Sequence, residues 1–269
     1  MLARSRELLK SRLREFWNAQ EEYWSYVTEE IATNSEVRAR AASFVPVSSK
    51  VLDVACGRGA NCVWLVERAQ YFGADLSLNG LLHAQRQGLR LTCGDAEALP
   101  FTTGCFDAVL ATYALEHSAN PVQMLSEMAR VVRPGGRLIL LGPCWDFPFW
   151  YPNSLLTRSR SVLWRLRYTG VRLIRQIVCM FGGPSPFLIV EQPDAFAQPF
   201  VYDADAVYVA WSYEIIRQVK RWGFRLVVAE ADDKLLGRNP GVRLLKQLLM
   251  LLPAYRYAGS TILMVFEKC

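Results

Sequence analysis

The feature that most constrains the fold is the stretch from Lys50 to Gly59, which reads KVLDVACGRG. It opens with a short apolar run, typical of a strand that is covered on both faces in a parallel sheet. Its two glycines, Gly57 and Gly59, allow a tight turn that approaches a ligand closely. We predict a helix over roughly residues 60–69, whose first N–H groups would face that ligand. A strand, a glycine turn and a helix in this order are typical of a nucleotide site.

A second strand is predicted over Tyr71–Asp75, and it ends in an acid 22 residues after Asp53. An acid at about this spacing, at the tip of the second strand, is where a ribose diol is held. One carboxylate can accept hydrogen bonds from both hydroxyls. The alternative is that Asp75 caps the helix that follows Ser77. Because the glycine turn precedes it at the right distance, we favour ribose binding.

Four segments in order resemble the motifs of class I S-adenosylmethionine (SAM) dependent methyltransferases. They are Val51–Gly59, Gly94–Phe101, Phe106–Val109 with Leu115–His117, and Arg130–Gly136. The first resembles the glycine-rich motif, but Ala55 stands where the usual D-x-G-x-G core has its first glycine. A methyl group is the smallest possible addition there, so we expect cofactor binding to survive. The resemblance covers roughly residues 45–142.

The resemblance implies a doubly wound α/β fold in one domain over residues 1–269, with a mostly parallel seven-stranded sheet. Its last strand is expected to run antiparallel, between strands five and six. We predict strands near 50–54, 71–75, 90–93, 105–111, 136–142, 224–229 and 261–266. Residues 1–45 are expected to form an N-terminal helical cap. Residues 143–204 are expected to form a helical insertion or lid after strand five, at the ligand-binding edge of the sheet.

The resemblance also implies that SAM is the cofactor and S-adenosylhomocysteine the product. Cofactor contacts are expected from Asp53, Ala55, Gly57, Gly59, Asp75, Leu76, Asp95 and Ala96. Asp95 would accept a hydrogen bond from the adenine amino group, with the backbone N–H of Ala96 beside it, and Leu76 would pack on the adenine face. Asp53 would lie near the sulfonium or amino group. A turn cap at Asp53 and a plain core role for Leu76 stay open as alternatives.

Methyl transfer from a sulfonium is an in-line displacement, so the enzyme mainly aligns acceptor, methyl and sulfur. A general base is needed only for a poorly acidic hydroxyl or a charged amine. His117, after the fourth strand, is the candidate, with a structural role in holding the loop as the alternative. Aromatic side chains are expected to line the acceptor pocket: Trp17, Tyr23, Trp24, Tyr113 and Trp145. For the first three, core packing is the alternative to a cover over the pocket.

Composition and net charge restrict the classes of partner, cofactor and substrate that the chain is expected to bind. The net charge of +6 and a pI near 9.0 indicate an anionic partner. Two histidines and seven cysteines without a C-x-x-C pair predict no metal site and exclude radical-SAM chemistry. Ala111–Ala114 stands where nucleic-acid methyltransferases carry an Asn-Pro-Pro-Tyr type tetrad, which argues against a nucleic-acid substrate. We predict methylation, at oxygen or nitrogen, of a small-molecule, lipid or lipid-linked glycan acceptor. The alternative is a SAM-binding protein with no methyl transfer or with a different SAM-assisted reaction.

The segment Leu155–Met180 carries six arginines and no acid, and we predict one helix there. Helical spacing gives an apolar stripe of Leu155, Leu156, Val162, Leu163, Leu166, Leu173, Ile174 and Ile177. Arginines border it on both sides, at positions 158, 165 and 172 and at positions 160 and 167. This pattern is typical of a helix lying in a membrane interface, and the basic, leucine-rich segment Lys234–Arg256 could join it. The alternative is a stripe that packs on the sheet, and Gly170 could break the helix.

A charged start rather than an apolar one, and scattered cysteines, favour a cytoplasmic location, with peripheral membrane contact through 155–180 as a further expectation. The sequence gives no indication of the oligomeric state.

Overall fold

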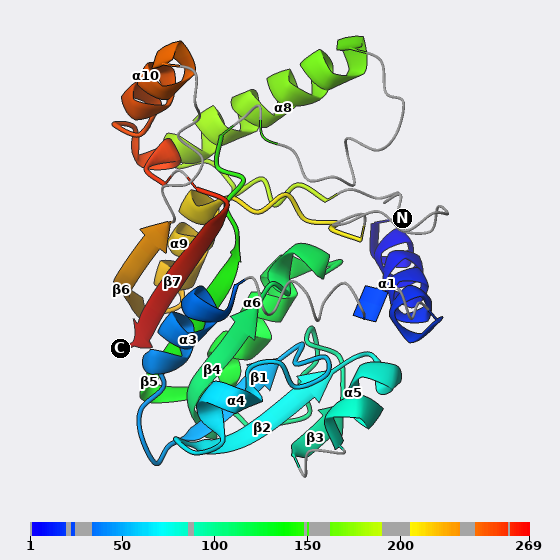
Figure 1. Cartoon of the computed structure of the whole chain (residues 1–269). Coiled ribbons are helices and arrows are strands. Elements are labelled where there is room, and N and C mark those ends of the chain that lie inside the picture. Colours follow the sequence, from blue (N-terminus) through cyan, green and yellow to red (C-terminus); the bar gives the residue numbers. More distant parts are fainter. Residues whose placement is uncertain are drawn as a thin grey trace.

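The computed structural model describes residues 2–19, 23–24, 34–85, 89–147, 150, 162–189, 205–231, 240–257 and 259–269. These residues build one seven-stranded sheet in the order β3-β2-β1-β4-β5-β7-β6 (Figure 1). The strands are β1 Lys50–Val54, β2 Gln70–Asp75, β3 Arg90–Cys93, β4 Phe106–Thr112, β5 Val132–Pro143, β6 Phe224–Ala231 and β7 Thr261–Lys268. Only β7 runs antiparallel, between β5 and β6, so the predicted sheet is confirmed.

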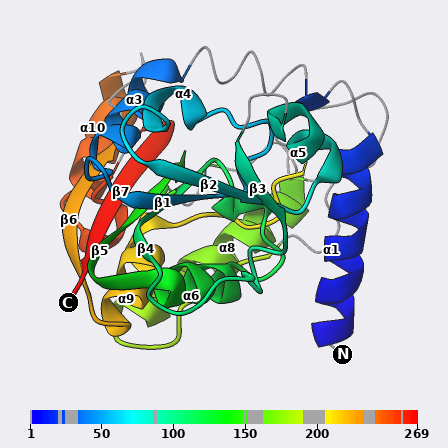
Figure 2. The same ribbon diagram turned by 90° about the horizontal axis from the view of Figure 1, so that it is seen from below.

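Helices cover both faces of the sheet. They are α1 Leu2–Ala19, α3 Ser35–Ser43, α4 Cys62–Leu65, α5 Leu78–Gln85, α6 Pro121–Val131, α8 Val162–Met180, α9 Ser212–Arg221 and α10 Pro240–Leu249, with short 3-10 turns η1 Leu115–His117 and η4 Pro253–Tyr255. Figure 2 shows α3, α4 and α5 on one face and α6 and α9 on the other. Buried side chains of α3 and α4 join one core cluster, and those of α6 and α9 join another. The central strands are therefore apolar on both sides.

The predicted helix over 60–69 is wrong in extent, because only Cys62–Leu65 is helical. The backbone N–H groups of Arg68 and Ala69 both donate to Leu65 O, which closes the helix early. Gln70 N then donates to Ser49 O as the chain enters β2. A helix of one turn has almost no macrodipole, so the expected contribution of a helix end to ligand binding is not supported by the structure.

The fifth strand begins earlier than predicted. It starts at Val132 rather than near residue 136, because Val132 pairs with Phe106 before the register shifts and Arg137 pairs with Ala108. The extra residues between these pairs include Gly135, whose φ of +70° suits glycine. The Pro-Gly-Gly sequence is thus an irregularity inside the strand, not a turn ahead of it.

Between β5 and α9 the chain holds a buried polar cluster that fastens the insertion to the sheet domain. Glu214 accepts hydrogen bonds from the Tyr208 hydroxyl at 2.6 Å and from Phe187 N at 2.8 Å. Asp146 accepts from Ser212 N at 2.9 Å. Burial raises the pKa of Glu214 to about 8, against the lowering effect of these hydrogen bonds and of the Arg172 charge.

We predict that the Glu214→Gln variant flattens the pH dependence of stability. The pKa of Glu214 lies above its ordinary value of 4.5, so the folded chain keeps a proton that the unfolded chain loses. This stability is complete below about pH 4.5 and is lost as the pH rises toward 8. Glutamine can accept from Phe187 N and donate to the Tyr208 hydroxyl, so the contacts survive.

The measurement is urea unfolding of both proteins between about pH 6 and 8. The matched control is Glu230→Gln, at an exposed carboxylate paired with Arg40, which should keep the wild-type slope. An equally steep fall of the unfolding free energy in the Glu214→Gln variant would contradict the assignment.

Candidate active site

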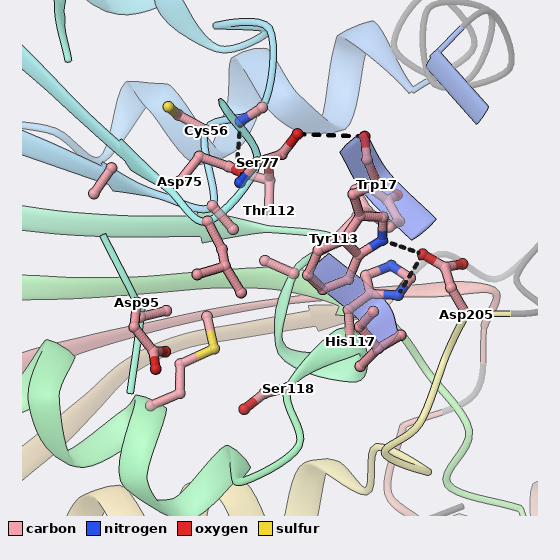
Figure 3. A pocket seen from close by; sticks show the side chains of 18 of the residues that line it. Trp17, Cys56, Asp75, Ser77, Asp95, Thr112, Tyr113, His117, Ser118 and Asp205 are labelled. Atoms are coloured by element: carbon pink, nitrogen blue, oxygen red, sulfur yellow. Dashed lines mark hydrogen bonds and ion pairs between the residues drawn. The ribbon is translucent and has the colours of Figure 1, made fainter. Parts of the chain in front are cut away.

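One cavity opens at the carboxyl ends of β1, β2 and β4, where the strand order reverses. This switch point is where open α/β sheets bind ligands. Side chains of α1 and the neighbouring Trp24 close the cavity from outside the sheet. Its open volume is about 1230 Å³ with the mouth and the adjoining solvent included. Figure 3 shows the lining side chains converging from these elements.

The glycine turn forms one wall. Ala55, Gly57 and Gly59 have φ angles of +58°, +51° and +80°, so every second residue is left-handed. For alanine this conformation costs about 1–2 kcal/mol, which the surrounding contacts must offset. A Cβ at Gly57 would lie 3.2 Å from the Trp24 ring, so only glycine fits easily there. Ala55 and Gly57 line the cavity, whereas Gly59 shapes the turn from behind.

The carboxylate of Asp75 stands at the tip of β2, as predicted. One oxygen accepts from Gly57 N at 2.8 Å and the other accepts from Ser77 N at 2.7 Å. Burial raises the pKa of Asp75, while these backbone hydrogen bonds act in the opposite direction. The Ser77 contact is the local turn that the capping alternative requires. Each carboxylate oxygen keeps a further lone pair, and Asp75 lines the cavity with Leu76 beside it.

Asp95 and Ala96 line the far end of the cavity, where α1 reaches them. Lys10 Nζ lies 2.8 Å from Asp95 Oδ2 and 2.7 Å from Glu97 Oε2. Burial by itself lowers the pKa of the Lys10 amine. The hydrogen bonds and charges of Asp95 and Glu97 outweigh this effect, so the pKa of Lys10 is raised. The interaction fastens α1 over the edge of the sheet beside the residue expected to bind adenine.

Asp53 does not line the cavity, although it was expected to contact the cofactor. It is fully buried, and its oxygens accept from Asn61 Nδ2 at 3.1 Å and from the Tyr71 hydroxyl at 2.9 Å. Burial raises the pKa of Asp53 to about 6, although these hydrogen bonds and the Arg38 charge lower it. Asn61 stands in the lining instead and separates Asp53 from the cavity.

Arg38, from α3, brings a cation to the same wall. Its guanidinium donates to Thr112 Oγ1 at 2.7 Å and to Asn61 Oδ1 at 3.2 Å. Within the described part of the chain, the buried Arg38 Nε has no hydrogen-bond partner. A buried N–H is costly to leave unpaired, so this atom suits an anionic ligand group. Together, the Arg38 cation, the Asp75 carboxylate and the Gly57 backbone fit a ligand that joins an amino acid to a nucleoside.

The expected aromatic lining is present with one exception. Trp17, Tyr23, Trp24 and Tyr113 all line the cavity. Trp145 does not, because it is 4% exposed and packs in the main core cluster. Its backbone carbonyl accepts a hydrogen bond from the buried Arg172. Trp145 follows β5, as expected, but its side chain points into the core.

His117 lies at the mouth of the cavity beside an acid that the sequence did not single out. Its Nδ1 is 3.2 Å from Asp205 Oδ2, and the same oxygen accepts a hydrogen bond from Trp17 Nε1 at 2.9 Å (Figure 3). Asp205 is buried and also lines the cavity. The carboxylate therefore links the candidate base to the N-terminal helix.

The sequence reasoning missed several residues that line the site, and three of them carry charges used above: Lys10, Arg38 and Asp205. Lys10 carries a signal, since it lies three residues before Leu13 and so shares one side of a helix with a buried leucine. Arg38 sits in a helix of low amphipathicity, and Asp205 follows a stretch without periodicity. Nothing local marks either of them as part of a site.

Comparisons with known proteins agree with this geometry. Residues 52–140 match the family described as a methyltransferase domain. A demethylmenaquinone methyltransferase of Mycobacterium tuberculosis (strain ATCC 25618 / H37Rv) is 35% identical over 122 residues, 45% of this chain and 47% of that protein. Phthiotriol/phenolphthiotriol dimycocerosates methyltransferase 1 of Mycobacterium ulcerans (strain Agy99) is 40% identical over 108 residues, 37% of this chain and 40% of that protein. The chain thus spans less than half the length of these curated relatives.

The fold extends the similarity beyond the matched segment. An S-adenosylmethionine dependent methyltransferase from Mesorhizobium loti superposes with a TM-score of 0.54 at 18% identity, over 86% of this chain and 95% of that one. At this identity the likeness shows the fold alone, and the family implies SAM as the cofactor. The chain therefore has the fold of class I SAM-dependent methyltransferases, and its residues 52–140 match a methyltransferase domain.

Proposed function

We propose that this protein transfers a methyl group from SAM to a hydroxyl or amine of a small-molecule or lipid acceptor. The observation that carries the proposal is one cavity that joins two halves. The nucleoside half has Asp75 and Asp95 at the strand ends, and the reacting half has His117 backed by Asp205. The family match over residues 52–140 supports the choice of cofactor.

In this proposal, Asp75 accepts hydrogen bonds from the ribose hydroxyls and Asp95 accepts from the adenine amino group. Gly57 lets the backbone pass beside the methionine part, and Arg38 Nε donates to its carboxylate. Asp53 acts indirectly, since it orients Asn61 from behind the wall. Lys10 offsets part of the negative charge of Asp95 and Glu97 and fastens α1 over this end of the cavity.

SAM supplies an electrophilic methyl group on a sulfonium. The residues of this chain must bring the acceptor in line with it and remove water. His117 Nδ1 lies beside the Asp205 carboxylate, and Nε2 lies 4.0 Å from Glu116 Oε1. With its proton on Nδ1, toward Asp205, His117 would accept the acceptor's proton at Nε2. With SAM bound, His117 Nε2 would take the proton of the acceptor oxygen or nitrogen as the methyl group moves to that atom from the sulfonium, which would leave as the neutral thioether. The Asp205 carboxylate stabilises the imidazolium that forms.

The acceptor class follows from the lining and from the relatives. Trp17, Tyr23 and Tyr113 give the reacting half apolar faces, which suit an apolar acceptor with a single polar group. The names of the two relatives denote a quinone precursor and a lipid as methyl acceptors. We therefore propose a lipophilic acceptor. A lipid-linked glycan is also compatible with this apolar lining.

The test uses SAM labelled in its methyl group with lipid and aqueous extracts of the source cells. Label in the organic phase, dependent on the protein, is the expected result. Label in the aqueous phase alone would keep methyl transfer but contradict the lipid acceptor. Tight binding of S-adenosylhomocysteine without transfer to either phase would favour the alternative, a SAM-binding protein with no methyl transfer.

We predict that Asp75→Ala weakens S-adenosylhomocysteine binding by about 1–3 kcal/mol, the cost of leaving buried polar groups unpaired. Isothermal calorimetry measures the change. Asp107→Ala is the matched control, because that carboxylate also accepts from a backbone N–H, at Lys50, but stands outside the cavity. The control should lose stability and keep affinity. Unchanged affinity in Asp75→Ala would remove Asp75 from the site.

We predict that His117→Ala lowers kcat by about 10²–10⁴-fold, the usual contribution of a general base, with cofactor affinity unchanged. Asp205→Asn should lower kcat and alter the pH profile of kcat/KM, because the imidazolium loses its stabilising charge. A purely structural Asp205 would lower stability and leave the pH profile as it is. Full activity of the His117→Ala variant would show that His117 is not a general base. The enzyme would then act only by aligning the acceptor with the methyl group.

A further inference from the structure

Helix α8 buries its polar side and exposes its apolar side, which is the reverse of an ordinary surface helix. Its buried side chains are Thr169, Arg172, Gln176 and Cys179. Its large apolar side chains face outward: Val162, Leu163, Leu166, Val171, Ile174, Ile177 and Val178, followed by Phe181. Leu163 is 76% exposed and Phe181 is 87% exposed. The sequence alternative, in which the apolar stripe packs on the sheet, is therefore wrong for this part of the helix.

Specific contacts hold α8 in this orientation. Arg172 is 1% exposed and donates to the backbone carbonyls of Trp145 and Trp150. The Tyr255 hydroxyl donates to Gln176 Oε1 at 2.8 Å, and Arg217 donates to Cys179 O at 2.6 Å. Turning the helix to bury its leucines would leave these polar groups unpaired. Arg172 was expected on the border of the apolar stripe, and this expectation is corrected, since the residue is an internal anchor.

The helix is continuous through Gly170, and a Cβ there would meet nothing within 4 Å. The predicted break is therefore absent. The first part of the predicted stripe, with Leu155, Leu156, Arg158 and Arg160, lies outside the described residues.

A second segment extends the same apolar surface. In α10 and the turn after it, Leu244, Leu245, Leu248, Leu251 and Leu252 are exposed. The ends of α8 and α10 meet at one small cluster around Cys179 and Tyr255, with Met180 and Leu249 packed against it. Figure 1 shows both helices at one end of the molecule, beyond the sheet. We call this surface the α8/α10 face, defined by residues 162–181 and 240–252.

Among the residues that the structure describes, most of the exposed large apolar side chains belong to the α8/α10 face. Of the 20 large hydrophobic side chains that are exposed in the described part, 13 belong to it. Monomeric proteins seldom expose so many large apolar side chains on neighbouring elements unless they meet a partner or a membrane. Single exposed leucines elsewhere, such as Leu82 on α5, need no such explanation.

The charge of the α8/α10 face indicates which kind of partner it meets. Residues 162–181 contain four arginines and no acid, and residues 240–252 contain one arginine, one lysine and no acid. Arg165, Arg167, Arg175 and Arg243 are exposed. A protein partner is commonly met by charges of both signs, whereas this face has one sign around an apolar centre. Arginines around exposed leucines match the headgroups and acyl boundary of an anionic bilayer.

We propose that the α8/α10 face docks the protein on an anionic membrane, with the two helices lying in the plane of the interface. Among the described helices, none is long and apolar enough to cross a membrane, so the contact is peripheral in this part of the chain. The inference goes beyond the proposed function, because docking requires neither SAM nor acceptor. If the acceptor is a lipid, the same face brings the insertion next to its source.

The test is flotation of the full chain with vesicles of phosphatidylcholine and phosphatidylglycerol in equal amounts, at low salt. The wild type should float with these vesicles, and far less with pure phosphatidylcholine or at high salt. Arg167→Glu with Arg175→Glu should weaken partitioning by about thirtyfold or more. Leu163→Gln, Leu166→Gln and Phe181→Gln together should weaken it by more than about tenfold.

Matched controls lie on other surfaces. Lys220→Glu with Arg221→Glu reverses two exposed charges at the end of α9, and Val63→Gln, Val66→Gln and Leu82→Gln remove exposed apolar groups on α4 and α5. Both control sets should float like the wild type.

The proposal is overturned if the wild type stays in solution, or if the variants of the face bind as well as the controls. It is also overturned if lipid-free wild type is a dimer that the apolar variant splits, since the face would then join two copies. Methyl transfer assayed without vesicles reports separately on the proposed function.

Discussion

The parallel pairing of β1 with β2 on one side and with β4 on the other is the constraint on which the site depends. It brings the ends of three strands to one edge, so that the glycine turn, Asp75 and the loop of His117 face one space. The two hydrogen bonds that Asp75 accepts from Gly57 and Ser77 then lock the turn to the tip of β2. Any ligand held there bridges two strands that the sheet has already positioned.

Two further attachments complete the cavity, and both are ionic or polar rather than apolar. Lys10 fastens α1 to Asp95 and Glu97, and Trp17 reaches Asp205 beside His117. On the insertion, Arg172 replaces what would ordinarily be a leucine in the buried side of α8. Because directional hydrogen bonds fix the orientation of α8, most of its large apolar side chains are left exposed. Trp17 faces the cavity, and the leucines of α8 face outward.

Local pattern was sufficient to predict the individual strands, the glycine turn and Asp75, whereas the antiparallel last strand and most of the cofactor contacts were predicted from the resemblance to class I methyltransferases. Strand ends, the glycine turn and Asp75 follow from residues close in sequence, and 11 of the 14 predicted site residues line the cavity. Trp145 and Asp53 do not line the cavity. A side chain at the end of a strand can point to either face of the sheet, and only packing decides which. Asp205 was missed because its partner, His117, is distant in sequence. The period of α8 predicted an apolar stripe but not that its polar side is the buried one.

A crystal structure with S-adenosylhomocysteine tests the central claim most directly, since it shows which strand ends hold the nucleoside. The account predicts that both ribose hydroxyls lie within hydrogen-bond distance of the Asp75 carboxylate. It places the adenine beside Asp95 and the methionine carboxylate toward Arg38 Nε. A ligand bound away from the ends of β1 and β2, or a ribose with no contact to Asp75, would contradict it.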